Sequence, residues 1–290
     1  MTEPTFRKDT RAPSHLPPPG ACDAQVHVFG PAAQYPLRRG ASYKVPEDAT
    51  IEAAEQLHRT LGFSRGVIVH ATSYGTDTRI LYDALRGRPN YRGITIVDDT
   101  VSDGELLKLH EAGVRGARFN FWKALNIAPS PESFRRNIER IQKLGWFAKI
   151  HVHGEELLDL GELIEPLTIR VVIDHMAHIE FKDGIAHPVC KRMVELLKRP
   201  NWWVMISNAD RHSAHDAIWP DAVPVAQKLI ETAPDQIVWG TDWPHVWYEK
   251  PKMPNDAELL ELFYRYAPSA AMQKRILVDN AARLFDFPNP

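Results

Sequence analysis

The sequence of residues 23–31 is DAQVHVFGP, in which apolar residues alternate with polar ones before a glycine and a proline. Alternation of this kind over a short run predicts a β-strand. Because side chains two positions apart on a strand share a face, Gln25 and His27 are expected to point in the same direction. The segment belongs to the first of eight similar runs, and their order along the chain predicts the fold.

Short runs rich in β-branched and apolar residues begin about 23 to 44 residues apart. They cover residues 22–29, 66–71, 92–97, 115–121, 147–153, 170–176, 202–207 and 236–244. Helical patterns fall between them at residues 50–61, 103–112, 130–144, 187–198, 223–233 and 255–265. This alternation is typical of an α/β (β/α)8 TIM barrel of about 250 residues. A doubly wound open sheet is the alternative, but no glycine-rich GxGxxG or GxxxxGKS/T segment follows a strand.

The barrel is expected to be a single domain over residues 21–290, after a partly disordered N-terminal arm, rich in proline and charge, over residues 1–20. The formal net charge is -2 and no basic stripe is present, so nucleic acid is not an expected partner. No apolar run is long enough to span a bilayer, and the N-terminus lacks the apolar segment of a signal peptide. A cytoplasmic protein with no membrane contact is therefore expected, of unknown oligomeric state.

Polar residues close most of the predicted strands. They are Gln25 with His27, His70 with Thr72, Arg118 with Asn120, His151 with His153, Asp174 with His175, Asn208 with Arg211, and Asp242. In a (β/α)8 barrel the C-terminal ends of the strands form one mouth, and the chemistry takes place there. One histidine at a strand end is usually a hydrogen-bonded core residue, but several histidines and an aspartate at one mouth predict a catalytic site.

Four motifs carry a resemblance to a known family: DAQVHVFGP, RGARFNFWK (residues 115–123), VIDHM (172–176) and WGTDWPH (239–245). With the closing NAARLF (280–285), they resemble the amidohydrolase superfamily. The resemblance is to the branch that contains 2-pyrone-4,6-dicarboxylate hydrolase and related lactonases. It extends from about Pro17 to Phe285, which is nearly the whole chain.

The resemblance implies that Asp242 activates the attacking water as a general base. His27, His151 and His175 are the other expected catalytic residues, donating hydrogen bonds to the substrate carbonyl. Arginines and hydroxyls near the mouth are expected to hold the substrate. Together with polar strand-end residues, the predicted substrate-binding set is Gln25, Tyr43, Thr72, Arg118, Asn120, Lys123, His153 and Arg211.

Three positions depart from the family pattern. Gln25 replaces the first histidine of a His-x-His pair, Ala124 replaces an arginine, and His151 replaces a tyrosine. Loss of a guanidinium removes a bidentate clamp for a carboxylate, which argues against the pyrone dicarboxylate itself as substrate. The expected substrate is another small anionic lactone, carboxylated or sulfonated, from aromatic-compound degradation, such as a muconolactone or pyrone carboxylate.

Several alternatives stay open at this point. Lactonases of the branch can act without a metal, so no cofactor is expected to be required. A single divalent ion such as zinc, held by His27, His151, His175 and Asp242, is the alternative, since three imidazoles and a carboxylate are suitable ligands. The alternative functions are a sugar-acid lactonase or lactone isomerase, and a barrel that binds a ligand without turning it over.

Overall fold

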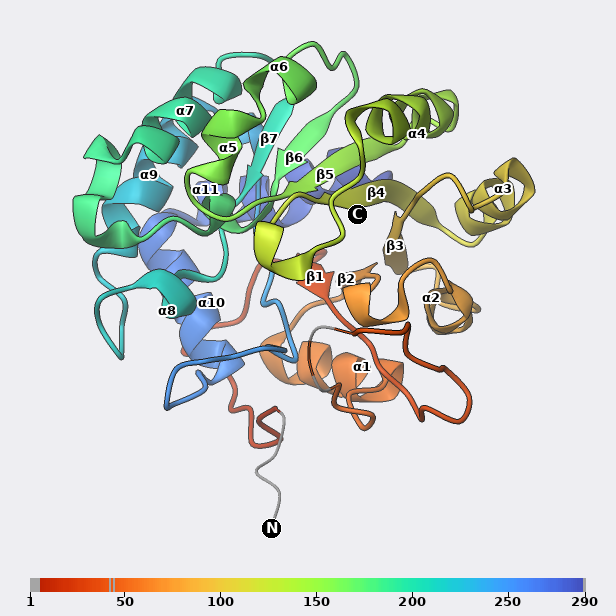
Figure 1. Ribbon diagram of the computed structural model, residues 1–290. Coiled ribbons are helices and arrows are strands. Elements are labelled where there is room, and N and C mark those ends of the chain that lie inside the picture. The colour runs from red at the N-terminus through yellow and green to blue at the C-terminus, as the bar shows by residue number, and fades with distance from the viewer. Residues whose placement is uncertain (1–5, 42, 44, 289–290) are drawn as a thin grey trace.

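Within the part of the chain that the computed structural model describes, residues 6–41, 43 and 45–288, eight parallel strands follow one another in the order β1 to β8. Their bounds are β1 (Cys22–Val26), β2 (Arg65–Val69), β3 (Tyr91–Ile96), β4 (Val114–Asn120), β5 (Phe147–His151), β6 (Val171–Ile173), β7 (Trp202–Met205) and β8 (Ile237–Val238). Each strand pairs in parallel with the next, and helices lie around the outside (Figure 1). The predicted (β/α)8 TIM barrel is confirmed.

Backbone contacts between β1 and the segment after β8 close the barrel. The amide of Ala24 donates to the Trp239 carbonyl (3.0 Å) and that of His27 to the Trp243 carbonyl (2.7 Å). A Cβ atom on Gly240 would lie 2.5 Å from the backbone nitrogen of Gln25, so only glycine allows the two segments to approach this closely. The closure brings the residues after β8 directly beside Gln25 and His27.

The helices are α1 (Ile51–Leu61), α2 (Arg79–Leu85), α3 (Asp103–Glu111), α4 (Pro131–Lys143), α5 (Glu156–Asp159), α6 (Gly161–Ile164), α7 (Pro188–Leu197), α8 (Ala209–His212), α9 (Ala222–Thr232), α10 (Asp256–Tyr266), α11 (Ala270–Lys274) and α12 (Ala281–Phe285). Side-chain caps explain several starts: Thr50 accepts from the Ala53 amide before α1, and Ser102 forms a capping box with Glu105 at α3. Every helical range predicted from the sequence contains a helix, whereas α2 was not predicted.

All eight strands end before the predicted runs do, and two of these early ends lead into left-handed turns. The run over residues 170–176 stops at Ile173, because His175, Met176 and Ala177 have positive φ angles of 47°, 49° and 55°. The run over 236–244 forms a strand only at Ile237–Val238, and Asp242 also has a positive φ of 64°. Left-handed backbone cannot continue a strand, so these residues turn across the barrel mouth.

Part of the predicted N-terminal arm packs on the barrel. Residues 1–5 lie outside the described residues. Phe6 is buried, and its ring meets that of Trp243 edge to face with 5.0 Å between centroids. Arg11 donates to Glu261 on α10 (2.8 Å), and Asn255 at the start of α10 donates to the Asp9 carbonyl (3.1 Å). The arm therefore contacts the C-terminal helices and the residue after Asp242.

Candidate active site

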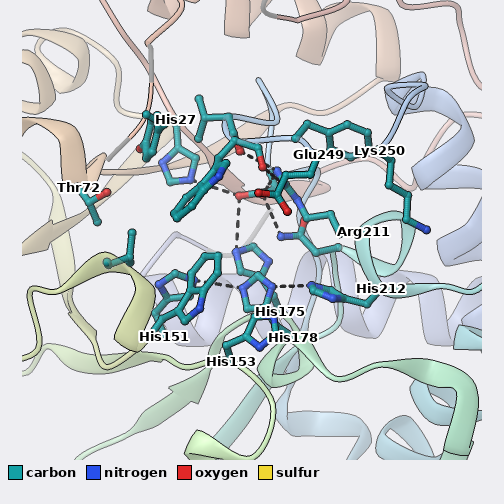
Figure 2. A pocket seen from close by; sticks show the side chains of 18 of the residues that line it. His27, Thr72, His151, His153, His175, His178, Arg211, His212, Glu249 and Lys250 are labelled. Atoms are coloured by element: carbon teal, nitrogen blue, oxygen red, sulfur yellow. Dashed lines mark hydrogen bonds and ion pairs between the residues drawn. The ribbon is translucent and has the colours of Figure 1, made fainter. Parts of the chain in front are cut away.

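A cavity of about 150 Å³ opens at the C-terminal ends of the strands. Of the residues predicted from the sequence, it is lined by His27, Tyr43, Thr72, Arg118, His151, His153, His175, Arg211 and Asp242. Figure 2 shows His27 and Thr72 on one side of the cavity, facing a group of histidines on the other. The barrel thus brings most of the predicted site together, while the roles of these residues stay predictions.

Asp242 lies at the base of the cavity and is almost fully buried. Its Oδ1 accepts from Gln25 Nε2 (2.9 Å) and its Oδ2 from Asn208 Nδ2 (3.0 Å). His27 Nε2 lies 3.3 Å from Oδ1, and Arg211 lies 3.4 Å from Oδ2. Burial alone would raise the pKa of this carboxyl, but His175, His27 and Arg211 outweigh it and hold the pKa well below its usual range. Asp242 is therefore ionised at neutral pH.

His27 is held by the neighbouring strand. Its Nδ1 lies 2.7 Å from the carbonyl oxygen of Val69 at the end of β2. A carbonyl can only accept, so Nδ1 carries a hydrogen and donates. The other ring nitrogen, Nε2, is left directed at Asp242. His27 is thus oriented so that its Nε2 can transfer a proton or form a hydrogen bond at the cavity.

Gln25 does not reach the cavity, although it was predicted to bind substrate. Its side chain is fully buried beneath Asp242 and does not line the cavity. Its Oε1 accepts a short hydrogen bond from Lys149, and its Nε2 lies 2.8 Å from His175 Nε2. In this arrangement Gln25 supports the residues of the site, and its contact with substrate stays a prediction.

His175 was expected to donate to the substrate carbonyl, and its hydrogen bonds argue otherwise. Burial lowers its pKa to about 4, so the ring is neutral at pH 7. Its Nε2 faces the amide nitrogen of Gln25, which can only donate, and its Nδ1 lies 2.8 Å from Ser207 Oγ. Nε2 is therefore an acceptor that is already occupied, and it has no hydrogen for a lactone oxygen.

A second histidine network was not predicted from the sequence. His151 Nε2 lies 3.1 Å from His178 Nε2, and His178 Nδ1 lies 2.9 Å from His212 Nε2. His212 in turn lies 3.4 Å from Glu180. Burial lowers the pKa of His151 and of His178 well below the usual value, so both rings are neutral at pH 7. His178 follows His175 by three positions in DHMAH, and only the left-handed turn brings both into the site.

The other ring nitrogen of His151 is also occupied. Its Nδ1 lies 2.9 Å from Asn120 Oδ1. With His178 on Nε2, a neutral His151 has no free N–H for a substrate carbonyl in this arrangement, and its donor role stays a prediction. Asn120 does not line this cavity and contacts His151 instead, and its contact with substrate stays a prediction.

Lys123 lies away from the cavity, in contrast to its predicted contact with substrate. Its side chain is 76% exposed, and its ammonium pairs with Asp159 at 3.3 Å. The neighbouring Trp122 takes the position at the cavity instead, stacked on His153, His178 and Trp247. The strand-to-loop turn after β4 therefore places the indole at the cavity and the amine in solvent.

A divalent ion does not fit the arrangement of these side chains. Among the described residues, no group of three or more His, Cys, Asp or Glu side chains is placed to hold a metal. Gln25 Nε2 lies between His175 Nε2 and Asp242 Oδ1, and His178 occupies His151 Nε2. The alternative zinc set of His27, His151, His175 and Asp242 is thus not assembled, and no chemical step below passes through a metal.

The C-terminal mouth of the barrel contains an ionised aspartate, oriented imidazoles and two guanidinium groups. This combination defines the active site of a (β/α)8-barrel enzyme. Comparison with known proteins makes this class more specific. The chain belongs to the amidohydrolase family, whose model matches residues 22–287. This confirms the resemblance identified from the sequence motifs.

Individual relatives cover nearly the whole chain. It is 35% identical over 271 residues to a 4-sulfomuconolactone hydrolase from Hydrogenophaga intermedia, covering 92% of this chain and 89% of that protein. It is 36% identical over 278 residues to a 2-pyrone-4,6-dicarboxylate hydrolase from Comamonas testosteroni, covering 92% and 90%. A crystal structure of an Agrobacterium tumefaciens protein without ligand aligns with a TM-score of 0.86 at 25% identity, covering 98% of this chain and all of that one.

Within the described residues, no helix is long and apolar enough to cross a membrane.

Proposed function

We propose that the protein hydrolyses a small anionic lactone, carboxylated or sulfonated, from aromatic-compound degradation, and that it does so in the cytoplasm. The observation that carries the proposal is the ionised Asp242 at the base of a small cavity that also contains Arg118 and Arg211. The two relatives named above act on anionic lactones, as their names state. The carboxylate can act as the base for attack by water, and the two guanidinium groups can attract a negatively charged substrate.

Asp242 is the general base in the proposed reaction. It takes a proton from water as the water oxygen bonds to the lactone carbonyl carbon, and the carbonyl becomes an oxyanion. The ring C–O bond then breaks, and the leaving oxygen takes the proton back from Asp242. A low pKa keeps Asp242 ionised and also makes it a weaker base, so this route requires a reactive acyl group such as an enol lactone.

The oxyanion is assigned to His27. Both ring nitrogens of His151 and of His175 lie 2.8 to 3.1 Å from other protein groups. His27 Nε2 lies beside the cavity, and its partner is the proposed base itself, Asp242 at 3.3 Å. A hydrogen on His27 Nε2 is donated to the developing negative charge. One preorganised donor of this kind is typically worth about 3 kcal/mol in the transition state.

Arg118 and Arg211 are assigned to the acidic group of the substrate. Both line the cavity and are mostly buried. Neither has a close bidentate carboxylate partner, since Arg118 lies 3.3 Å from Asp174 and Arg211 lies 3.4 Å from Asp242. Guanidinium groups with donors to spare suit a carboxylate or a sulfonate.

The deciding experiment is a hydrolysis assay on muconolactones and pyrones that carry a carboxylate or a sulfonate. It is run with and without chelator, on protein of measured metal content, with the products identified by NMR. Ring-opened acids would support the proposal, and rearranged lactones would instead indicate an isomerase. Binding of these lactones without any turnover would indicate a ligand-binding barrel.

A further inference from the structure

Lys149 is a buried cation that the proposed reaction does not use. It lies on β5, two positions before His151, and its side chain is 1% exposed. Its ammonium donates to Gln25 Oε1 through a short hydrogen bond, and it lies 3.1 Å from Asp174 and 3.3 Å from the sulfur of Met205. Burying an ammonium is costly even when it is paired. Asp174 also has Arg118 as a partner, so charge balance alone does not explain the lysine.

The hydrogen bonds around Gln25 have one consistent direction. An ammonium has three donors and no acceptor, so the atom of Gln25 that faces Lys149 must be the carbonyl oxygen. The amide nitrogen then faces the other way and donates to Asp242 Oδ1 (2.9 Å) and to His175 Nε2 (2.8 Å). His175 Nε2 must accept, so the single hydrogen of the neutral ring is on Nδ1 and is donated to Ser207.

We propose that Lys149 is a positioning residue that acts through Gln25 to fix the tautomer of His175 and the orientation of the Asp242 carboxylate. The Gln25 amide nitrogen lies between a histidine nitrogen and a carboxylate oxygen and donates to both. Lys149 supplies the positive charge behind that amide. The lysine and the glutamine together therefore hold His175 and Asp242 in one arrangement.

Loss of the ammonium removes the restraint on this network. Gln25 Oε1 then loses its donor, so the side chain is held only through its amide nitrogen and can move away from Asp242 and His175. Once His175 Nε2 loses the donor from Gln25, the ring hydrogen can move to Nε2, which lies 3.3 Å from Asp174 Oδ1 and 3.6 Å from Asp242 Oδ1, where it competes with the attacking water. This part of the inference rests on the proposed lactone hydrolysis.

The direct test is ¹⁵N NMR of protein with labelled histidine, because the two ring nitrogens of a neutral histidine have different shifts. The His175 signals are assigned by their loss in His175→Gln. The wild-type protein is expected to show the Nδ1–H tautomer, and Lys149→Met is expected to lose it. Lys149→Arg keeps a donor and should restore the tautomer at least in part. Lys143→Met, the same change at an exposed site on α4, is the matched control and should leave the spectrum unchanged.

Turnover is measured on the same variants. Lys149→Met should lower kcat about 100-fold, the lower part of the range for general acid–base catalysis, with KM within about twofold because the arginines are untouched. A lysine that only stabilised the fold would lower the melting temperature and leave the kcat of the folded protein unchanged. If Lys149→Met does not fold, Gln25→Glu provides the test, because a carboxylate still accepts from Lys149 but has no N–H for His175.

The inference is overturned if wild-type His175 carries its hydrogen on Nε2. It is also overturned if the folded Lys149→Met or Gln25→Glu protein keeps both the wild-type tautomer and the wild-type kcat. The NMR measurement needs no substrate, so it separates this inference from the proposed function. An Nδ1–H tautomer that depends on Lys149, in a protein that hydrolyses no lactone, would refute the function and leave the hydrogen-bond assignment in place.

Discussion

Asn208 donates a hydrogen bond from Nδ2 to the Oδ2 atom of Asp242 over 3.0 Å. The two residues follow β7 and β8, and both have left-handed backbone, with φ angles of 61° and 64°. Among residues with a side chain, Asn and Asp tolerate this conformation best. The paired turns direct the carboxylate across the mouth, where the amide fixes one of its oxygens.

Asp242→Asn tests the general base. We expect kcat for lactone hydrolysis to fall by about 1,000-fold or more, since an amide cannot accept the proton of water. Circular dichroism and thermal melting should show a folded protein, because the side chain keeps its volume. Asp159→Asn, an exposed aspartate beyond the cavity, is the control and should leave kcat unchanged. Near-normal turnover by Asp242→Asn would rule out the assignment.

Arg118→Met and Arg211→Met test recognition of the acidic group. A hydrogen bond to a charged group contributes about 1.5 to 3 kcal/mol, so each change should raise KM for an anionic lactone by roughly 10- to 100-fold. KM for a neutral lactone of the same ring should change much less. Lys123→Met, which removes an exposed cation, should change neither value. Equal increases for charged and neutral lactones would contradict the assignment.

The barrel fold could be predicted because each strand and helix has its own pattern over a short stretch of sequence. Each short apolar run contains a strand, and every helical range predicted between these runs contains a helix, as expected from period-two and period-3.6 patterns. The short helix α2 was missed because its seven residues span barely two turns. The early ends of β6 and β8 were missed because left-handed turns at His175 and Asp242 depend on the surrounding structure.

The sequence predicted many of the residues of the site but not the hydrogen bonds between them. Strand-end position identified about half of the residues that line the cavity. The partners of Gln25 and His151 could not be identified in this way, because they depend on how segments far apart in sequence meet. Lys149 had a usable signal, because it shares a strand face with His151 and therefore points into the barrel one layer lower. Its partner could not be read from the sequence, since Gln25 lies on β1.

Phe6→Ala tests the packing of the N-terminal arm. The Phe6 ring is buried against Trp243, so its loss should lower the free energy of unfolding by about 3 kcal/mol. Leu16→Ala, at a side chain on the same arm that is 65% exposed, should cost less than about 0.5 kcal/mol. Urea unfolding measures both values. Equal small effects would show that the contact of Phe6 with Trp243 does not stabilise the barrel.

The buried neutral histidines predict how stability depends on pH. Burial lowers the pKa of His70 to about 4, whereas an unfolded chain has a histidine pKa of about 6.5. As the pH falls, His70 therefore binds a proton in the unfolded chain at a higher pH than it does in the folded protein. The stability from a neutral His70 is fully present above about pH 6.5 and is lost progressively as the pH falls toward about 4. His175 has a similarly lowered pKa and acts in the same direction.

His70→Gln isolates the contribution of one such histidine. In urea unfolding at about pH 6 and about pH 5, the wild-type free energy of unfolding should fall on acidification. The fall should be smaller in His70→Gln by about 1 kcal/mol per pH unit, because one proton no longer binds selectively to the unfolded chain. This difference in slope does not depend on how much the substitution destabilises the protein at neutral pH. Parallel slopes would mean that His70 takes up a proton equally in both states, contrary to its burial at 2% exposure.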